Sequence, residues 1–570
     1  MKKSIKSTFV KISICTLLLM GIYCVPTAMA SVVQLDTTFN TVGYVIHDNA
    51  AGGSSTENVI SSQIQSDGKY VVSGFSINLA GNMDMAIWRY NTDGTLDTTF
   101  NVVGYTVHDS AAGGSSHDSG VSLQIQSDGK YVVAGYSRTL AGDYDLAIWR
   151  YNTDGTLDTT FNVVGYATHD NAAGGSGSDW GRSLQIQSDG KYVVAGYSRN
   201  AAGNDDMVIW RYNTDGTLDA TFNAVGYIIH DNAAGGSGND TGQSLQIQSD
   251  GKYVVAGNST NAAANTDMAI WRYNADGTLD TTFNTVGYAT HDSAAGGSGA
   301  EVIYSLQIQS DGKYVVAGYS TNAAGNWDMA IWRYNTDGTL DTTFNTVGYA
   351  AHDSAAGGSG DDAGWSLYIQ SDGKYVISGR SRNAAGDDDL AIWRYNTDGT
   401  LDTTFNTVGY LTHNGAAGGV GKDEGWYVRV QSDGKFVVAG RSRNAAGNDD
   451  MAIWRYETVA GITVNAIDSV TGEDGNTGSF SIVLDSRPTA NVVINILSSD
   501  TSEGTASPSS LTFTSTNWST PQTVTITGVD DALVDGDFTY NIVTAAAVST
   551  DTLYNGLNPD DVSMINTDVV

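Results

Sequence analysis

Hydrophobic and polar residues alternate along short runs through most of the chain, and turn-forming residues separate these runs. In residues 183–198, SLQIQ-SDGK-YVVAGYS, two alternating runs flank an Asp-Gly turn, which predicts a β-hairpin. A third run, DMAIWRY at residues 84–90, also alternates, and it precedes the turn NTDG, the sequence LDTTFN and a further short run. No stretch with helical periodicity is long enough to compete. The pattern predicts an all-β chain with about four strands in each unit.

The same unit recurs seven times at a step of 61 residues, without insertion or deletion. Its strands carry apolar residues on both faces, so each sheet needs a neighbouring sheet on either side. A ring of seven four-stranded blades provides this cover and leaves no free end. We therefore expect a seven-bladed β-propeller over residues 31–456, with an open β-solenoid as the alternative. The tryptophan of an [AV]-I-W-R-Y motif marks each copy, at Trp88, Trp149, Trp210, Trp271, Trp332, Trp393 and Trp454.

The motifs L-D-T-T-F-N, I-Q-S-D-G-K-Y-V-V-A-G and A-I-W-R-Y-N-T-D-G-T resemble the delta-60 repeat of exported bacterial proteins. The resemblance covers about residues 35–456 and recurs in phase. It implies a propeller-like fold and a surface or extracellular location, and it implies no particular chemistry. The chain differs from the usual L-D-x-x-F-G of that family at Asn40 and its equivalents, which follow the Phe.

The first 30 residues have the organisation of a secretory signal peptide. Four lysines precede the apolar run ISICTLLLMGIY, and Ala28-Met29-Ala30 forms a small-x-small site that predicts cleavage before Ser31. The apolar run is shorter than the ~20 residues of a membrane span. We expect a secreted or cell-surface protein without a transmembrane segment. Both cysteines, Cys15 and Cys24, would leave with the signal peptide.

The charge balance narrows the choice of partners. The chain has 28 Lys and Arg against 62 Asp and Glu, a formal charge of −34. Nucleic-acid binding requires clustered basic residues, so this balance argues against it. With 16% charged and 41% hydrophobic residues, the chain also differs from a disordered acidic segment.

After a linker at residues 457–461 the composition changes. Residues 462–570 lose the 61-residue step, become rich in Thr and Ser, and contain short alternating runs typical of a β-sandwich. The strings G-S-F-S-I-V-L-D-S-R-P and L-T-F-T-x-x-N-W-x-T-P-Q-T-V-T-I-T-G-V-D-D resemble a Calx-beta or cadherin-like module. That resemblance implies calcium held by acidic residues at strand ends, with a solvated acidic surface as the alternative. The matching positions are Glu473, Asp474, Asp530, Asp531, Asp535 and Asp537.

Three polar or aromatic features repeat in step and favour structural roles. The N-T-D-G-T-L-D segment resembles part of a calcium loop, but Arg89 stands where the first carboxylate would be. We expect a tight turn there, with Asp97 near Arg89. The histidine that recurs from His47 onward is interpreted as a repeated hydrogen-bonding residue, and the motif tryptophans as core residues.

Near-identical blades would create seven equivalent sites, which suits binding better than catalysis. No nucleophile elbow, P-loop or HExxH motif is evident. We therefore predict an exported, non-catalytic binding or adhesion protein. The alternatives are an extracellular polysaccharide hydrolase or lyase using carboxylates such as Asp205, Asp388 or Glu424, and a structural spacer at the cell surface.

The copies differ most at two positions, which we expect to lie in loops on one face of the propeller. Aromatic residues there could stack on a glycan or grip a protein ligand, although drift at exposed tips would also produce variation. The first position holds Ile60, Val121, Arg182, Gln243, Tyr304, Trp365 and Trp426. The second holds Met83, Tyr144, Asp205, Thr266, Trp327, Asp388 and Asp449. The predicted contact residues are Trp180, Tyr304, Trp327, Trp365 and Trp426.

Overall fold

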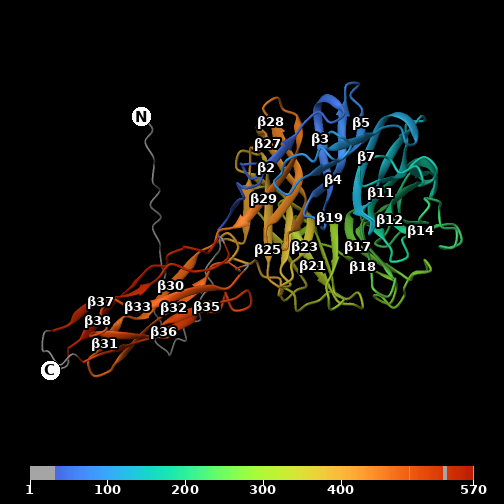
Figure 1. Ribbon diagram of the computed structural model, residues 1–570. Coiled ribbons are helices and arrows are strands. Elements are labelled where there is room, and N and C mark those ends of the chain that lie inside the picture. Colours follow the sequence, from blue (N-terminus) through green and yellow to red (C-terminus); the bar gives the residue numbers. More distant parts are fainter. Residues whose placement is uncertain (1–31, 487, 489, 531–535, 552, 569–570) are drawn as a thin grey trace. The chain divides into compact units, whose positions relative to one another are not determined.

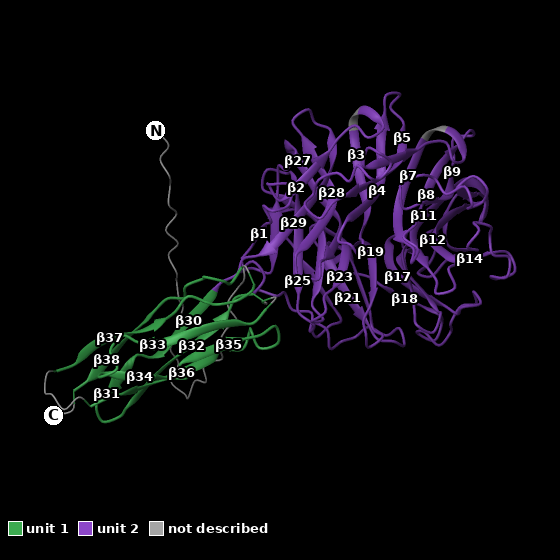
Figure 2. Cartoon of the chain, viewed as in Figure 1, with its two compact units in different colours: residues 1–29, 462–570 green, residues 30–461 purple. Residues whose placement is uncertain are grey.

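The computed structural model describes residues 32–568 except 487, 489, 531–535 and 552, and it leaves the side chains of 54, 55, 115 and 116 undescribed. The expected signal peptide, residues 1–30, lies outside the described residues. The regular elements are all β-strands, and the described part of the chain contains no helix long and apolar enough to cross a membrane. Apart from the segment before Ala30, the chain divides into two compact units, Ala30–Gly461 and Ile462–Val570 (Figure 2).

The first unit is a ring of seven four-stranded antiparallel blades (Figure 1). Each blade begins with a long strand that contacts the corresponding strand of the next blade, and these strands surround the centre of the ring. The innermost strands are β3 (Gly52–Ile64), β7 (Gly113–Ile125), β11 (Gly174–Ile186), β15 (Gly235–Ile247), β19 (Gly296–Ile308), β23 (Gly357–Ile369) and β27 (Gly418–Val430).

The next two strands of each blade carry most of the core. The second strands are β4 (Tyr70–Asn78), β8 (Tyr131–Thr139), β12 (Tyr192–Asn200), β16 (Tyr253–Asn261), β20 (Tyr314–Asn322), β24 (Tyr375–Asn383) and β28 (Phe436–Asn444). The third strands are β5 (Met83–Tyr90), β9 (Tyr144–Tyr151), β13 (Asp205–Tyr212), β17 (Thr266–Tyr273), β21 (Trp327–Tyr334), β25 (Asp388–Tyr395) and β29 (Asp449–Thr458).

The fourth strands are short and lie at the outer edge of the blades. Six of them follow their own blade in sequence: β6 (Tyr105–His108), β10 (Tyr166–His169), β14 (Tyr227–His230), β18 (Tyr288–His291), β22 (Tyr349–His352) and β26 (Tyr410–His413). The seventh blade takes its fourth strand from the opposite end of the unit. That strand is β2 (Tyr44–His47), which pairs with β29 through Tyr44↔Trp454 and His47↔Met451.

The first strand of the unit, β1 (Val33–Leu35), also pairs with β29, and this pairing helps to close the ring (Figure 2). Asp36 follows β1 and accepts hydrogen bonds from Arg455 Nε at 2.7 Å and Lys435 Nζ at 2.5 Å. Arg455 also donates to Tyr70 Oη at 3.1 Å, in the first blade. The sequence alone predicts seven blades but does not show whether they close into a ring. In the structure, these contacts between the N-terminal segment and the last blade close the ring.

The blades pack through both faces, as the alternation predicts. The seven motif tryptophans have no exposed surface, and each apolar cluster joins residues of two neighbouring blades. The Phe of six L-D-x-T-F segments packs edge-on against a Tyr of the next blade, for example Phe161 against Tyr192 at 5.7 Å between ring centroids, and Phe405 packs in the same way against Phe436. The predicted core role of the tryptophans is therefore confirmed.

The NTDG segments form tight turns, as predicted. Gly94 N donates to Asn91 O, and Asp97 lies beside Arg89, with Arg89 Nε donating to Asp97 Oδ2 at 2.6 Å. Lys69 Nζ donates to the same carboxylate oxygen at 2.8 Å. This buried arrangement repeats in every blade, and Asp36 supplies the carboxylate for the seventh.

The repeated histidines make structural contacts at the blade interfaces, in agreement with the prediction. His47 Nδ1 lies 3.2 Å from Glu57 Oε2, and His108 Nδ1 accepts from Trp149 Nε1 at 3.2 Å. Burial lowers the pKa of His230 to about 4, so this ring is neutral at pH 7. A neutral, hydrogen-bonded ring suits a packing role.

Buried carboxyls at the blade interfaces predict that the propeller is more stable at mildly acidic pH than at pH 8. Burial, followed by repulsion from neighbouring carboxylates, raises the pKa of Asp145 and Asp179 to about 7. The ordinary pKa is 3.8, so the folded state binds more protons than the unfolded chain between pH ~4 and ~7, and stability falls as pH rises through that range. The same causes raise the pKa to about 6 at Asp84, Asp240, Asp267, Asp362, Asp389 and Asp450.

Thermal unfolding at pH 5 and pH 8 measures this effect, and the midpoint should be higher at pH 5. Asp36 acts in the opposite sense, because hydrogen bonds from Lys435 and Thr38 outweigh its burial and lower its pKa to about 2. Its contribution is present above pH ~4 and is lost as pH falls towards 2. A propeller that is equally stable at pH 5 and pH 8 would contradict the prediction, and Asp179→Asn should reduce the difference.

The second unit is a β-sandwich of two sheets. One sheet has the order β30-β32-β36-β34 and the other β31-β38-β37-β33-β35. The strands are β30 (Ile462–Asp468), β31 (Val470–Gly472), β32 (Thr477–Leu484), β33 (Val492–Ser498), β34 (Gly504–Ser507), β35 (Ser510–Phe513), β36 (Gln522–Gly528), β37 (Phe538–Thr544) and β38 (Val562–Thr567). Inward residues such as Phe480, Val524 and Ile542 are fully buried between the sheets.

Candidate binding site

Each innermost strand contains a β-bulge, and the bulge places one variable residue towards the centre of the ring. In β11 the register shifts between Gly181 and Ser183, so that Arg182 is the extra residue. A bulge re-aims a side chain and leaves the strand otherwise paired. The glycine opposite is required, because a Cβ at Gly196 would lie 1.8 Å from the carbonyl oxygen of Trp180. The bulge residues of the seven blades are Ile60, Val121, Arg182, Gln243, Tyr304, Trp365 and Trp426.

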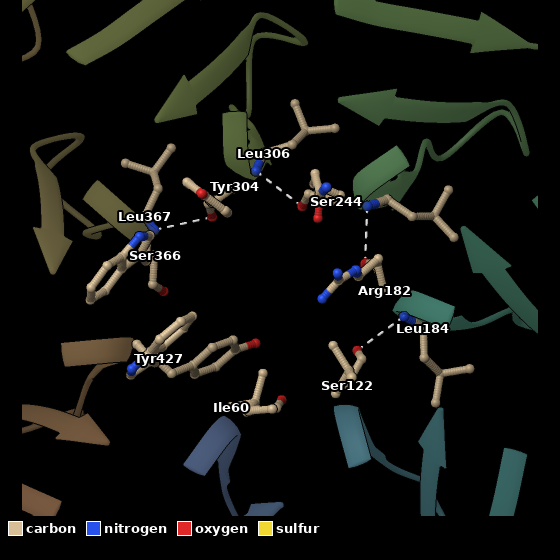
Figure 3. Close-up of a pocket in the computed structure, with 18 of the residues that line it drawn as sticks. Ile60, Ser122, Arg182, Leu184, Ser244, Tyr304, Leu306, Ser366, Leu367 and Tyr427 are labelled. Atoms are coloured by element: carbon tan, nitrogen blue, oxygen red, sulfur yellow. Dashed lines mark hydrogen bonds between the residues drawn. The ribbon is translucent and has the colours of Figure 1, made fainter. Parts of the chain in front are cut away.

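These residues line a cavity of about 390 Å³ in the centre of the ring, which we call the channel cavity (Figure 3). One side is aliphatic, at Ile60 and Val121. Another side is aromatic, at Tyr304 and the two bulge tryptophans. Figure 3 shows Arg182 and Tyr427 pointing into the cavity from opposite sides. The cavity is therefore asymmetric although the backbone around it is repeated.

A ring of hydroxyl groups links neighbouring innermost strands around the cavity. Ser183 Oγ accepts from Leu245 N at 3.0 Å, and the same bond joins five other pairs of blades. In the seventh blade Tyr427 replaces the serine, and in the first blade Ser62 replaces the leucine. Tyr427 therefore occupies space that a serine leaves open elsewhere, and it changes the cavity wall at the seam between the last and first blades.

The aromatic side of the cavity continues into a cluster across blades five to seven. Trp365 and Trp426 stack with 4.4 Å between ring centroids and 13° between their planes. Tyr319 stacks on Trp327 at 4.2 Å, and Tyr304 lies 6.2 Å from Tyr319. Flat apolar rings that are half-buried, as the three tryptophans are, offer rigid contact surfaces at low entropic cost.

Arginines connect these rings. The Arg380 guanidinium lies 5.5 Å from the Trp327 ring centroid and 5.7 Å from that of Trp365. Arg441 lies 5.6 Å from the Trp426 ring centroid. These distances are within the range of cation–π attraction, so both arginines help to hold the tryptophans in place.

Trp180 belongs to a second cluster, on blades two and three. Its ring centroid is 4.0 Å from that of Tyr136 and 5.0 Å from that of Tyr144. It also stacks with Tyr197 at 6.0 Å, and Arg182 lies over it at 5.0 Å. Arg182 lines the channel cavity, so it connects this cluster to the cavity wall.

The carboxylates that could serve an enzyme are held by arginines. Asp388 is 3% exposed and accepts from Arg380 Nη1 at 2.8 Å, and Glu424 is 1% exposed and accepts from Arg441 Nε at 2.6 Å. Asp205 accepts from Arg199 Nε at 3.0 Å. A carboxylate held in an ion pair is oriented towards its partner, which suits a structural role.

The expectation that the variable positions lie in loops is wrong. Tyr304, Trp365 and Trp426 are bulge residues inside innermost strands, and Trp180 also lies within one, in β11. Trp327 is the first residue of β21. The runs before SLQIQ contain Gly and Ser and therefore read as loops, whereas the structure pairs them as the first half of 13-residue strands. The structure groups Tyr304, Trp327, Trp365 and Trp426 around Tyr319 and Arg380, and it places Trp180 in the other cluster.

Sequence reasoning missed several residues of this site. Arg380 and Arg441 stand where other copies have Tyr, Phe or Asn, and Arg429 stands where five copies have Gln. Tyr427 stands where six copies have Ser. Each is a departure from the repeat, so comparing every column of the seven copies would have found them.

The acidic residues predicted to bind calcium gather at one end of the sandwich. Glu473 N donates to Thr567 O, and Gly536 N donates to Asp568 Oδ2 at 2.9 Å. Asp568 Oδ1 is buried without a hydrogen-bond partner among the described residues. Asp474, Asp530 and Asp537 are described, whereas Asp531 and Asp535 lie outside the described residues. Within the described part of the chain, no group of three or more His, Cys, Asp or Glu is arranged to hold a metal ion.

A protein-family model described as "Domain of unknown function (DUF5122) beta-propeller" matches the chain seven times. No curated protein matches this chain. The matches follow the repeat, at residues 65–100, 126–161, 187–222, 248–283, 309–344, 370–405 and 431–459.

Among solved structures, the chain is similar to a protein of unknown function from Dyadobacter fermentans DSM 18053, at 12% identity and a TM-score of 0.39, over 75% of this chain and 99% of the other. An ulvan lyase bound to a GlcA–Rha3S oligosaccharide also has 12% identity and a TM-score of 0.39, over 73% and 94%. A fucose lectin from Kordia zhangzhouensis has 11% identity and a TM-score of 0.19, over 30% and 95%. At such low similarity these structures indicate nothing about a ligand. The seven family matches and the seven observed blades together show that this chain is a β-propeller of seven repeated blades, each of which is similar in part to that family model.

Proposed function

We propose that this protein is an exported, non-catalytic binding protein whose propeller takes a glycan at the channel cavity and its aromatic rim. One observation carries the proposal: departures from the seven-fold repeat collect around a single cavity and place stacked aromatic rings there. Variation without function would be expected to scatter over the exposed turns. Stacked, half-buried tryptophans beside hydrogen-bonding Gln and Tyr side chains offer the contacts that a sugar ring uses, with apolar faces and polar edges.

The electrostatics around the cavity favour binding over hydrolysis. Glycoside hydrolysis uses a pair of carboxyl groups that flank the bond to be broken. Among the described residues that line the channel cavity, none is Asp or Glu. The nearby carboxylates of Asp388 and Glu424 are engaged by arginines.

Affinity electrophoresis tests the proposal. The mature protein is run in gels cast with a panel of neutral and acidic polysaccharides, and a parallel solution assay measures new reducing ends and unsaturated ends. We expect retardation by at least one polysaccharide without new ends. New ends would contradict the non-catalytic function and indicate a hydrolase or lyase. Retardation by none of the panel would contradict glycan binding and leave a protein ligand or a spacer.

We also propose that calcium stabilises the C-terminal sandwich, at the end where Glu473, Asp474, Asp530 and Asp537 gather. Calcium prefers six to eight oxygen ligands, and the buried, unpartnered Oδ1 of Asp568 is an oxygen of that kind. The Calx-beta resemblance and this grouping support the proposal together.

Calcium should therefore raise the unfolding temperature of the sandwich. At a free concentration 100-fold above Kd, ligand binding adds about 2.7 kcal/mol to the stability of the unit that binds. Differential scanning calorimetry in calcium and in chelator measures the shift. Asp537→Asn should reduce it, whereas Asp560→Asn, which lies near the opposite end of β37, should leave it unchanged. An equal unfolding temperature with calcium and chelator would refute the proposal.

A further inference from the structure

Basic residues are scarce in this chain, and their placement is uneven. Of the 28 Lys and Arg residues, fourteen occupy the same two positions in each repeat, four lie in the first 30 residues and one is Arg487. The remaining nine all lie in β8, β11, β12, β24, β27 and β28, which are innermost or second strands of blades two, three, six and seven. Of these nine residues, Arg182 and Arg429 line the channel cavity.

The fourteen repeated cations are neutralised locally. In each blade one Lys and one Arg hold a single buried Asp, as Lys69 and Arg89 hold Asp97. Five of the other nine are also paired: Arg380 and Arg382 with Asp388, Arg441 and Arg443 with Asp449, and Arg199 with Asp205. These ion pairs stabilise the propeller itself. Because a carboxylate already neutralises each of these cations, they are poorly suited to binding an anionic ligand.

Arg182 and Arg429 differ from these residues. Both line the channel cavity, and neither makes an ion pair with any described carboxylate. Arg182 Nη2 donates to Tyr197 Oη at 3.1 Å, while its Nε atom is buried without a partner among the described residues. Arg429 donates to the hydroxyl of Tyr427 and, at 2.9 Å, to its neighbour's carbonyl oxygen, Val428 O. The five donors of a guanidinium exceed what these contacts use.

We propose that the sugar bound in the channel cavity carries a carboxylate or sulfate group, which Arg182 and Arg429 recognise. This inference rests on the proposed function and names its substrate class. The planar guanidinium group can donate two parallel hydrogen bonds to a carboxylate, and it also binds sulfate. In a half-buried cavity this electrostatic attraction is stronger than it would be in bulk water. The cavity walls hold no described carboxylate that would compete. Around it, the acidic surface repels anions in general, so the cavity is the place where an anionic sugar is favoured.

The aromatic wall makes the ligand a sugar and not a bare anion. Trp365, Trp426 and Tyr304 provide apolar surface on one side, where a pyranose ring can stack, and Arg182 projects from another side. A cavity of about 390 Å³ lies near the lower end of the range for small-ligand sites, about 300–1,000 Å³, so it accommodates a short segment of a glycan chain.

Matched polymers test this inference in affinity gels. Polygalacturonate is compared with its methyl-esterified form, which removes carboxylates, and κ-carrageenan with agarose, which lacks the sulfate. We expect at least a tenfold lower dissociation constant for one acidic polymer than for its neutral match, and the responding pair identifies the anionic group. Equal retardation by both members, or retardation confined to neutral polymers, would overturn the inference and leave glycan binding intact. Retardation by no polysaccharide in either panel would overturn the proposed function and this inference together.

Substitutions test whether Arg182 and Arg429 cause the preference for acidic polymers. Arg182→Gln and Arg429→Gln should each reduce the acidic preference at least about fivefold, and Arg182→Lys should retain part of it. Arg199→Gln is the matched control, since its side chain is half-exposed and already paired with Asp205. Thermal unfolding of each variant confirms that the propeller is folded. An unchanged preference in the folded Arg182→Gln and Arg429→Gln double variant would contradict the assignment.

Discussion

A propeller that lacks residues 31–47 should lose its closed ring. This segment supplies β1, β2 and Asp36, so its removal exposes the outer edge of β29 and leaves Arg455 and Lys435 without their carboxylate. Breaking a buried ion pair by removing one partner costs about 3–5 kcal/mol, and the loss of two strands adds to this. We expect the single unfolding transition of the propeller to disappear or to move to a much lower temperature. Calorimetry measures the transition, and X-ray scattering measures the expansion of the ring.

A pair of point variants distinguishes the effect of ring closure on stability from the effect of losing one ion pair within a blade. Asp36→Ala and Asp97→Ala remove equivalent carboxylates, but Asp36 ties the N-terminal segment to the last blade whereas Asp97 acts within its own repeat. Both should destabilise the fold, and Asp36→Ala should do so more. A peptide of residues 32–48 added to the truncated chain should restore part of the stability. A truncated chain that unfolds at the same temperature as the full propeller would show that β2 does not close the ring.

Replacing the stacked tryptophans with alanine should abolish most glycan binding. Trp365 and Trp426 form one continuous platform, so removing either ring also deprives the other of its packing partner. Truncating a central aromatic contact typically costs about 2 kcal/mol or more, which is roughly a 30-fold rise in the dissociation constant. Because the two rings act together, each single variant should already lose most of what the double variant loses. Retardation in affinity gels measures the loss.

Val121→Ala is the matched control for these variants. Val121 is the bulge residue of β7 and lines the aliphatic side of the same cavity, so its truncation changes the wall without removing a platform. We expect a change in affinity below about threefold. Trp365→Phe should retain part of the binding, because a smaller ring still stacks. Full affinity in the Trp365→Ala and Trp426→Ala double variant would place the ligand elsewhere on the protein.

Much of the fold could be predicted because the same strand and turn pattern occurs seven times in the sequence. The Asp-Gly turns, the alternation around each motif tryptophan and the constant 61-residue step together specify seven four-stranded blades. Ring closure could not be predicted, because it depends on residues that precede the first complete repeat. Tyr44–His47 has the same sequence pattern as the other outer strands, but its partner, β29, lies some 400 residues later in the chain.

The sequence identifies several aromatic residues that cluster in the structure, but it assigns them to loops and the structure places them in strands. The columns of variable residues identify Tyr304, Trp365 and Trp426, but the Gly- and Ser-rich composition of segments such as Gly357–Gly360 predicts loops. Pairing with the next strand overrides that local preference, and the bulge after Gly364 then turns Trp365 towards the cavity. A bulge has no clear signature in a single sequence, so the central cavity became visible only in three dimensions.

Oxidative footprinting of tryptophans measures most directly whether the asymmetric channel cavity and its rim bind the ligand. The protein is oxidised with and without the polysaccharide that retards it, and each tryptophan is followed by mass spectrometry. The seven motif tryptophans are fully buried and should resist oxidation in both samples. Trp365 and Trp426 should be oxidised in the free protein and protected at least severalfold by the ligand. Protection elsewhere, with equal oxidation of Trp365 and Trp426 in both samples, would show that the ligand does not bind at the channel cavity.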